Sequence, residues 1–282
     1  MISRRTKGLG LALIVGLLGS TNAMAKDPID VSNIRQVQTS STDVFEVLAT
    51  LSVAQSDLAS RDYVAASRGF ETVLFHDPSQ KVARVGMRRS LMALGHFKDA
   101  ANYVDDNSSP DSVLIAVQLG AADDPLGLIL ETLKTNSDPR LWTLLGQLQD
   151  SAGQPETARQ SYAMAGIAGA RAGLAENNIG QSHWLVGEYD LALNAFDKAV
   201  VADPSDIQFD NNRRRVLIKL GQLHEAILGL NSNRAGVFLE QAGDQAIEEN
   251  ETQLAYYLYR KSLDISPRHN PQTAIKLARL EK

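Results

Sequence analysis

A small side chain that returns about every 34 residues constrains the fold of this chain more than any other feature of its sequence. It is found at Ala66, Ala100, Ala158, Ala192, Ala226 and Ala255. The spacings are 34, 58, 34, 34 and 29 residues. Because 58 is twice 29, a further unit lies within the longest interval, with Ile129 at the equivalent place. Such a period is typical of solenoid proteins, in which each unit buries its apolar surface against its neighbours.

Other positions repeat in the same register and divide each unit into two helices. A glycine stands five residues before four of the alanines, at Gly95, Gly153, Gly187 and Gly221. A bulky residue follows the small one after four residues, at Phe70, Val104, Leu133, Tyr162, Phe196, Leu230 and Tyr259. A proline follows three of the alanines after twelve residues, at Pro78, Pro204 and Pro267. The glycine separates the two helices and the proline ends the second one. The small residues let the helices approach closely, and the bulky ones fill the gap to the next unit.

These positions resemble the tetratricopeptide repeat (TPR), as do Trp142, Leu145 and Gly146 in the first helix of one unit. The resemblance covers about residues 46–269 and implies an all-α fold, a right-handed TPR superhelix of about seven helix–turn–helix units. We place the units near 47–80, 81–109, 110–138, 139–172, 173–206, 207–235 and 236–269. Residues 271–280 read as an amphipathic helix that caps the open end, as solenoids need. We therefore expect a TPR domain over 46–282 with about 15 helices and no strands.

The N-terminus has the layout of a secretory signal peptide over residues 1–25. Arg4, Arg5 and Lys7 precede an apolar run of about ten residues, and Ala23-Met24-Ala25 forms a small-x-small cleavage pattern. The alternative is an uncleaved anchor. Residues 26–45 are polar without clear periodicity and are predicted to be a flexible lead-in. A second long apolar stretch is absent from the sequence, so we expect no integral membrane span and a periplasmic protein of a Gram-negative bacterium.

Composition excludes several kinds of chemistry. The sequence has no cysteine, which excludes disulfides, thiolate metal sites, a cysteine nucleophile and a lipid anchor on cysteine. Lys plus Arg number 28 and Asp plus Glu 33, an acidic balance that argues against a nucleic-acid partner. The five histidines have no second ligand at a metal-binding spacing, and no phosphate-binding or nucleophile motif is present. We expect no enzyme activity, no cofactor and no metal.

The TPR resemblance implies that side chains of the first helices line a concave groove that binds a partner. Our candidate groove residues are Asn177, Asn178, Gln181, Trp184, Asn211, Asn212, Arg215 and Arg89. The two asparagine pairs lie 34 residues apart. An amide both donates and accepts, so such a ladder suits the backbone of an extended peptide. The alternative is that these amides bond a neighbouring helix and maintain the superhelical pitch.

An arginine run follows the second asparagine pair, at Arg213-Arg214-Arg215. Arg215 and Arg89 stand at the ninth position of their units, which faces the groove in the TPR family. There a guanidinium suits the carboxylate of an acidic segment or of a polypeptide C-terminus. The alternative is pairing within the protein, for example with Asp210. Trp184 adds an apolar contact to the groove or, alternatively, packs against the adjacent unit.

These features favour a non-enzymatic, exported TPR adaptor that holds a protein segment or terminus. The segment 177–230, with its asparagine pairs and its Gly187-Glu188-Tyr189 turn, resembles the TadD family of tight-adherence (Flp) pilus assembly. That resemblance implies a role in building or operating an envelope secretion machine. Members of that family commonly carry a lipid on cysteine, and this sequence departs from them there. The alternative is a TPR scaffold of a cell-wall or polysaccharide synthesis or export complex, with an acidic polymer near Arg89 and Arg215.

Overall fold

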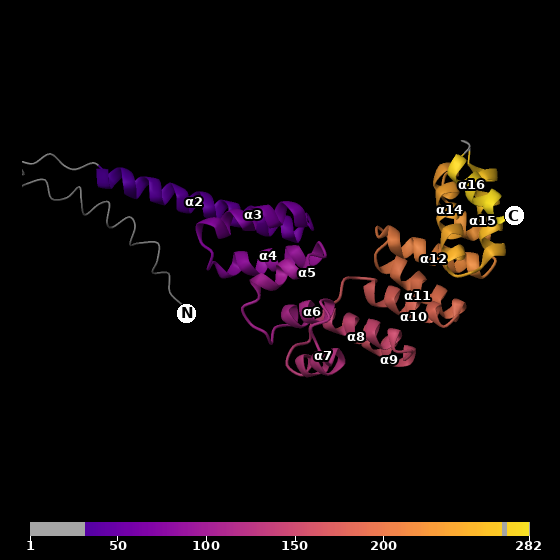
Figure 1. Cartoon of the computed structure of the whole chain (residues 1–282), viewed down its shortest axis with the longest axis horizontal. Helices are drawn as coiled ribbons and strands as arrows, with labels where there is room; N and C mark the ends of the chain where they lie inside the picture. Colours follow the sequence, from indigo (N-terminus) through magenta and orange to yellow (C-terminus); the bar gives the residue numbers. More distant parts are fainter. Residues whose placement is uncertain (1–31, 267–269, 282) are drawn as a thin grey trace, which may run out of the picture. The chain divides into compact units, whose positions relative to one another are not determined.

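The computed structural model describes residues 32–266 and 270–281, and side chains from residue 44 onward. Within these residues the polypeptide forms fifteen α-helices and one short 3-10 helix, without any strand, which confirms the predicted all-α fold (Figure 1). It divides into two compact units between Gly95 and His96. The predicted signal peptide and residues 26–31 of the predicted lead-in lie outside the described part.

The first helix begins earlier than the sequence predicts. Helix α2 spans Ser32–Ala59, so it includes most of the segment that we predicted to be a flexible lead-in. Residues 32–45 contain neither glycine nor proline. Extending an existing helix through such residues costs little, because the unfavourable nucleation step has already been made by the residues that follow. The start of the amphipathic pattern near residue 46 is therefore not the start of the helix.

The first unit packs α2 against α3 (Tyr63–His76) and α3 against α4 (Lys81–Ala93). The ring of Phe70 is completely buried and lies against Gly86, where an added Cβ would stand 2.2 Å from the ring. Glycine is the one residue that lets the ring reach the backbone of α4 here. The repeated aromatic residue of the sequence is therefore the core residue of this helix pair.

The second unit continues the pattern of paired helices. In sequence order its elements are α5 (Phe97–Ala100), η1 (Ala101–Tyr103), α6 (Pro110–Gln118), α7 (Pro125–Leu133), α8 (Pro139–Ser151), α9 (Pro155–Ile167), α10 (Leu174–Leu185), α11 (Tyr189–Ala202), α12 (Ile207–Lys219), α13 (Leu223–Ile227), α14 (Ser232–Glu248), α15 (Thr252–Ile265) and α16 (Pro271–Leu280). Helix α16 is the predicted C-terminal helix, and it packs against α15.

The repeated glycines and aromatic residues explain why the helices pair. An added Cβ at Gly146 would lie 2.5 Å from the ring of Tyr162, and one at Gly180 would lie 2.8 Å from the ring of Phe196. The absence of a side chain lets the second helix of each pair seat its ring directly on the first helix. The predicted turn glycines adopt left-handed backbone angles, for example a φ of 76° at Gly187, and so end the first helices.

An arginine replaces this glycine in the 29-residue unit at 207–235. Arg214 stands where Gly180 and Gly243 stand in the flanking units. Its guanidinium donates to the carbonyl oxygens of Ala226 (2.7 Å) and Leu228 (3.0 Å). These oxygens lie at the end of α13, which has only 5 residues, against 14 in α11. The arginine thus binds the carbonyls of a helix that stops early.

The unit at 81–109 has the same combination of features. Arg88 stands at the same repeat position and is buried. The second helix of that unit is also short, because α5 has 4 residues and continues as the 3-residue helix η1. A full-length second helix accompanies glycine at this position in three units, and a shortened one accompanies arginine in two. The third 29-residue unit, at 110–138, has Val117 at this position and a second helix of 9 residues, so arginine accompanies the short second helix in two of the three shorter units.

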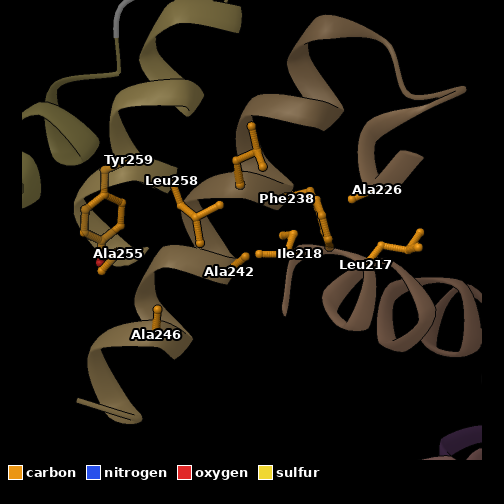
Figure 2. Packing of buried hydrophobic residues seen from close by; sticks show 10 residues of the cluster. Leu217, Ile218, Ala226, Phe238, Ala242, Ala246, Ala255, Leu258 and Tyr259 are labelled. Carbon is orange, nitrogen blue, oxygen red and sulfur yellow. The ribbon is translucent and has the colours of Figure 1, made fainter. Parts of the chain in front are cut away.

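A continuous apolar core joins the last helices, as Figure 2 shows. Leu217 and Ile218 of α12 meet Phe238 and the small side chains of α14, and Leu258 of α15 fills the next layer. Lys276 of α16 then pairs with Glu240 and Asp244 of α14, both at 2.8 Å. The terminal helix is consequently held by charge as well as by apolar contact.

The hydroxyl of Tyr259 makes the stability of this core sensitive to alkaline pH. Burial and a hydrogen bond to Asp244 (2.8 Å) raise the pKa of Tyr259 to about 12. A hydroxyl with a raised pKa stabilises the fold fully below its unfolded pKa of about 10, and this contribution is lost as the pH rises through the folded value. We expect the free energy of unfolding to fall more steeply between pH 10 and pH 12 for the wild type than for Tyr259→Phe. Urea denaturation across this range measures it, and parallel curves would contradict it.

Candidate partner-binding site

The predicted site residues of the second unit lie on two helices. Asn177, Asn178, Gln181 and Trp184 belong to α10, whereas Asn211, Asn212 and Arg215 belong to α12. Both are the first helices of their pairs, and α11 packs against each of them. Arg89, the eighth predicted residue, is exposed on α4 in the first unit.

The asparagines divide between two roles. The side-chain nitrogen of Asn212 donates to the side-chain oxygen of Asn177 at 2.8 Å, which links α12 to α10. Asn177 in turn donates to Asn178 at the long distance of 3.4 Å. The bond between the helices agrees with the alternative that these amides maintain the pitch between units. Asn211 lines a different groove, between α12 and α14.

The three consecutive arginines differ in their partners. Arg213 pairs with Asp197 of α11, and Arg214 pairs with Asp210 (2.7 Å) and the carbonyls at the end of α13. Arg215 has neither a hydrogen bond nor an ion pair with any residue that the structure describes. Two of the guanidiniums therefore have structural partners, while the third keeps its donors available.

Arg215 lines a small depression between three first helices. Its other lining residues are Gln181, Trp184, Phe196, Asn212 and Gln245. Its empty volume is about 190 Å³ when the open solvent at its mouth is included, so it is a shallow surface feature. Three side-chain amides thus surround one guanidinium, with an indole at the side. This set of groups offers several hydrogen-bond donors and a single positive charge.

The indole of Trp184 is held from two sides. The ring of Tyr189 contacts it edge-on with centroids 5.4 Å apart, and the ammonium of Lys219 lies 5.5 Å from its centroid. Lys219 also binds the carboxylates of Glu249 and Glu251. Although burial opposes the charge, these two carboxylates raise the pKa of Lys219 above its usual value. Lys219 thus stays protonated with its charge balanced by two carboxylates, and the guanidinium of Arg215 is the cation that lines the depression.

Solved structures supply the comparison with known proteins. A tetratricopeptide repeat protein from Parabacteroides merdae aligns over 84% of this chain and 99% of its own length, with 12% identity and a TM-score of 0.46. The Cut9-Hcn1 hetero-tetramer of APC/C aligns over 84% of this chain and 53% of its own, with 13% identity and a TM-score of 0.50. The human IFIT1 dimer with m7Gppp-AAAA aligns over 77% of this chain, with 17% identity and a TM-score of 0.54. This chain spans 59% of that neighbour. No protein-family model and no curated protein match the sequence.

Three helix pairs of the second unit, α8–α9, α10–α11 and α14–α15, repeat one packing contact, an aromatic ring seated on a glycine of the preceding helix. The protein has the tetratricopeptide-repeat fold. The TPR pairs bring together four of the eight predicted residues, namely Gln181, Trp184, Asn212 and Arg215. They do so because α10 and α12 are the first helices of consecutive repeats and these four side chains lie on the same side of the two helices.

The sequence did not indicate one residue of this TPR surface. Gln245 of α14 lines the depression, yet it stands at the tenth position of its unit, where the repeat pattern carries no signal. Helix α14 starts at Ser232, four residues before the start of the predicted unit at 236. Among the residues that the structure describes, no group of three acidic or histidine side chains could hold a metal ion. None of the described helices is both long and apolar enough to cross a bilayer.

Proposed function

We propose that this protein is a non-enzymatic scaffold that binds another protein, and that the Arg215 depression binds a carboxylate of that protein. The observation that carries the proposal is the contrast between Arg215, which has no partner among the described residues, and its two paired neighbours. A partly buried guanidinium next to an aromatic ring is costly to hold without a partner. An external carboxylate removes this cost and forms two parallel hydrogen bonds.

The groups around Arg215 indicate the chemistry of the ligand. Gln181, Asn212 and Gln245 supply side-chain amides. Asn212 and Gln245 each already donate one hydrogen bond, to Asn177 and Glu249, and keep a second N–H and the oxygen for the backbone of an extended segment. Trp184 offers an apolar flank. An acidic side chain or the C-terminal carboxylate of a polypeptide meets all of these groups. The net charge of −5 argues against a nucleic acid as the ligand, because its closely spaced phosphates would be repelled most strongly.

The setting of the scaffold is the second part of the proposal. The N-terminal sequence supports export to the periplasm, and the likeness of residues 177–230 to the TadD family supports a role in the assembly of a tight-adherence (Flp) pilus. The partner is then a component of that envelope machine. A segment of that component binds in the Arg215 depression.

The arginine contrast provides the experiment. The full-length protein with an affinity tag is expressed in the source organism, and its partners are captured and quantified for the wild type, Arg215→Ala and Arg213→Ala. We expect Arg215→Ala to lower recovery of the principal partner by a factor of about ten or more, as loss of a charge-assisted pair implies. Arg213→Ala removes only a surface ion pair, so we expect recovery of the principal partner to stay at the wild-type level. Equal recovery from all three proteins would contradict the proposal.

A further inference from the structure

A second, larger groove lies between α12 and α14. It is lined by Val200, Pro204, Ile207, Asp210, Asn211, Leu230, Asn233, Arg234, Val237, Phe238 and Gln241. Its free volume is about 1340 Å³, including its open mouth. The Arg215 depression shares no residue with it. The two are therefore separate surfaces of the same unit.

The groove exists because α13 is short. In the unit before it, the last two turns of α11 pack Phe196 and Ala199 into the core beside α10 and α12. Helix α13 ends at Ile227, so it lacks nine of the 14 residues that α11 has. The surface on α12 and α14 that these turns would cover is left open. Arg214 maintains this state by binding the carbonyls at the end of α13.

The open surface is apolar at its centre. Ile207 at the start of α12 is 73% exposed, and Val237 on α14 is 53% exposed. Both line the groove, and Phe238 forms its floor next to the core of Figure 2. Covering such side chains stabilises a complex by about 25 cal/mol for each Å² removed from water. The groove thus has an apolar centre that none of the described elements covers.

The rim of the groove carries a positive charge. The guanidinium of Arg234 has no partner among the described residues, and the same holds for the amides of Asn211 and Asn233. The one carboxylate in the lining, Asp210, is already paired with Arg214. The charge complement of this surface is therefore an acidic group next to an apolar one.

We propose that this groove binds a short amphipathic helix of a partner protein, which takes the place of the missing turns of α13. Nine residues of helix span about 14 Å, so about two and a half turns fill the gap. Apolar side chains at i and i+4 of this helix pack on Ile207 and Val237, and an Asp or Glu pairs with Arg234. The chemistry is that of a helix in a groove. The inference goes beyond the Arg215 site and does not depend on it.

The test uses a phage-displayed library of 14-residue helical peptides with randomised surface positions, selected on the immobilised full-length protein. We expect the enriched peptides to share two apolar residues four apart with an adjacent acid. One such peptide is synthesised and titrated. We expect its affinity for the Val237→Glu variant to be at least ten times lower than its affinity for the wild-type protein. Val53→Glu, an exposed valine of α2, and Arg215→Ala leave its affinity unchanged. Circular dichroism confirms that each variant is folded.

Two further measurements test the role of Arg234 and ask whether the occupant is a second copy of this protein. Arg234→Glu lowers the affinity for the acidic peptide, and a peptide with lysine in place of the acid binds that variant with restored affinity. Enriched peptides that lack the helical pattern, or that bind Val237→Glu as well as the wild type, would overturn the proposal. So would a dimer of the full-length protein, seen by light scattering, that Val237→Glu converts to a monomer. In that case the occupant is a second copy of this protein.

Discussion

Phe196→Ala is expected to lower the free energy of unfolding by about 3–5 kcal/mol, because it removes the ring around which one helix pair is built. Phe196 is 1% exposed and packs with Ala192 and Val216. Its ring lies directly on Gly180, so the neighbouring backbones cannot close the space that alanine leaves. Urea denaturation followed by circular dichroism measures the change.

The matched control for this prediction is an aromatic residue outside the core. Phe75 is 84% exposed, and we expect Phe75→Ala to change the free energy of unfolding by no more than about 0.5 kcal/mol. Similar losses in the two variants would show that the ring of Phe196 does not hold the helix pair together. In a repeat protein the loss can also appear as unfolding of one part before the rest, so the slope of the transition is compared as well.

The second large effect is expected at the ion pair that joins α6 to α8. The guanidinium of Arg140 lies 2.7 Å from Asp111, whose carboxylate is buried, and 2.7 Å from Asp138. Although burial raises it, the bonds and charge of Arg140 hold the pKa of Asp138 below its usual value. We expect Arg140→Met to cost about 3 kcal/mol, because it leaves the buried carboxylate of Asp111 without this cation.

A double variant separates the charge effect from general damage to the structure. Asp111→Leu combined with Arg140→Met removes both charges, and we expect it to be more stable than Arg140→Met alone. Lys134→Met is the surface control, because Lys134 and Glu131 form an exposed pair that contributes about 0–1 kcal/mol. A double variant that loses the sum of the stabilities lost by its single changes would contradict this expectation.

Most of the fold was predictable because the repeat signal is local and redundant. The small residue, the turn glycine and the bulky residue recur together, so a unit that lacks one of them is still identified from the others. The shortened helices were less visible. The spacing of 29 residues between Ala226 and Ala255 indicated a shorter unit, but only the structure shows that Arg214 binds the end of α13. Such a contact depends on where a long side chain folds, which spacing alone does not determine.

The site was predictable in part, and for a related reason. The helical period places Gln181, Trp184 and Arg215 on the same side of successive first helices, and the structure brings them together. Which arginine of a run keeps its donors available depends on the carboxylates nearby. Arg213 finds Asp197 sixteen residues away, on another helix. Sequence position gives no access to that pairing, nor to the open groove that the short α13 leaves beside Arg234.

Site-specific photocrosslinking in the living cell tests whether the Arg215 depression binds a partner protein. A photoreactive amino acid replaces Gln181, which lines the Arg215 depression, or Gln222, which is exposed at the start of α13. We predict a covalent adduct with one partner protein at position 181, little or none at position 222, and loss of the adduct when Arg215→Ala is added. Equal adducts at both positions, or an adduct that Arg215→Ala leaves unchanged, would contradict this prediction.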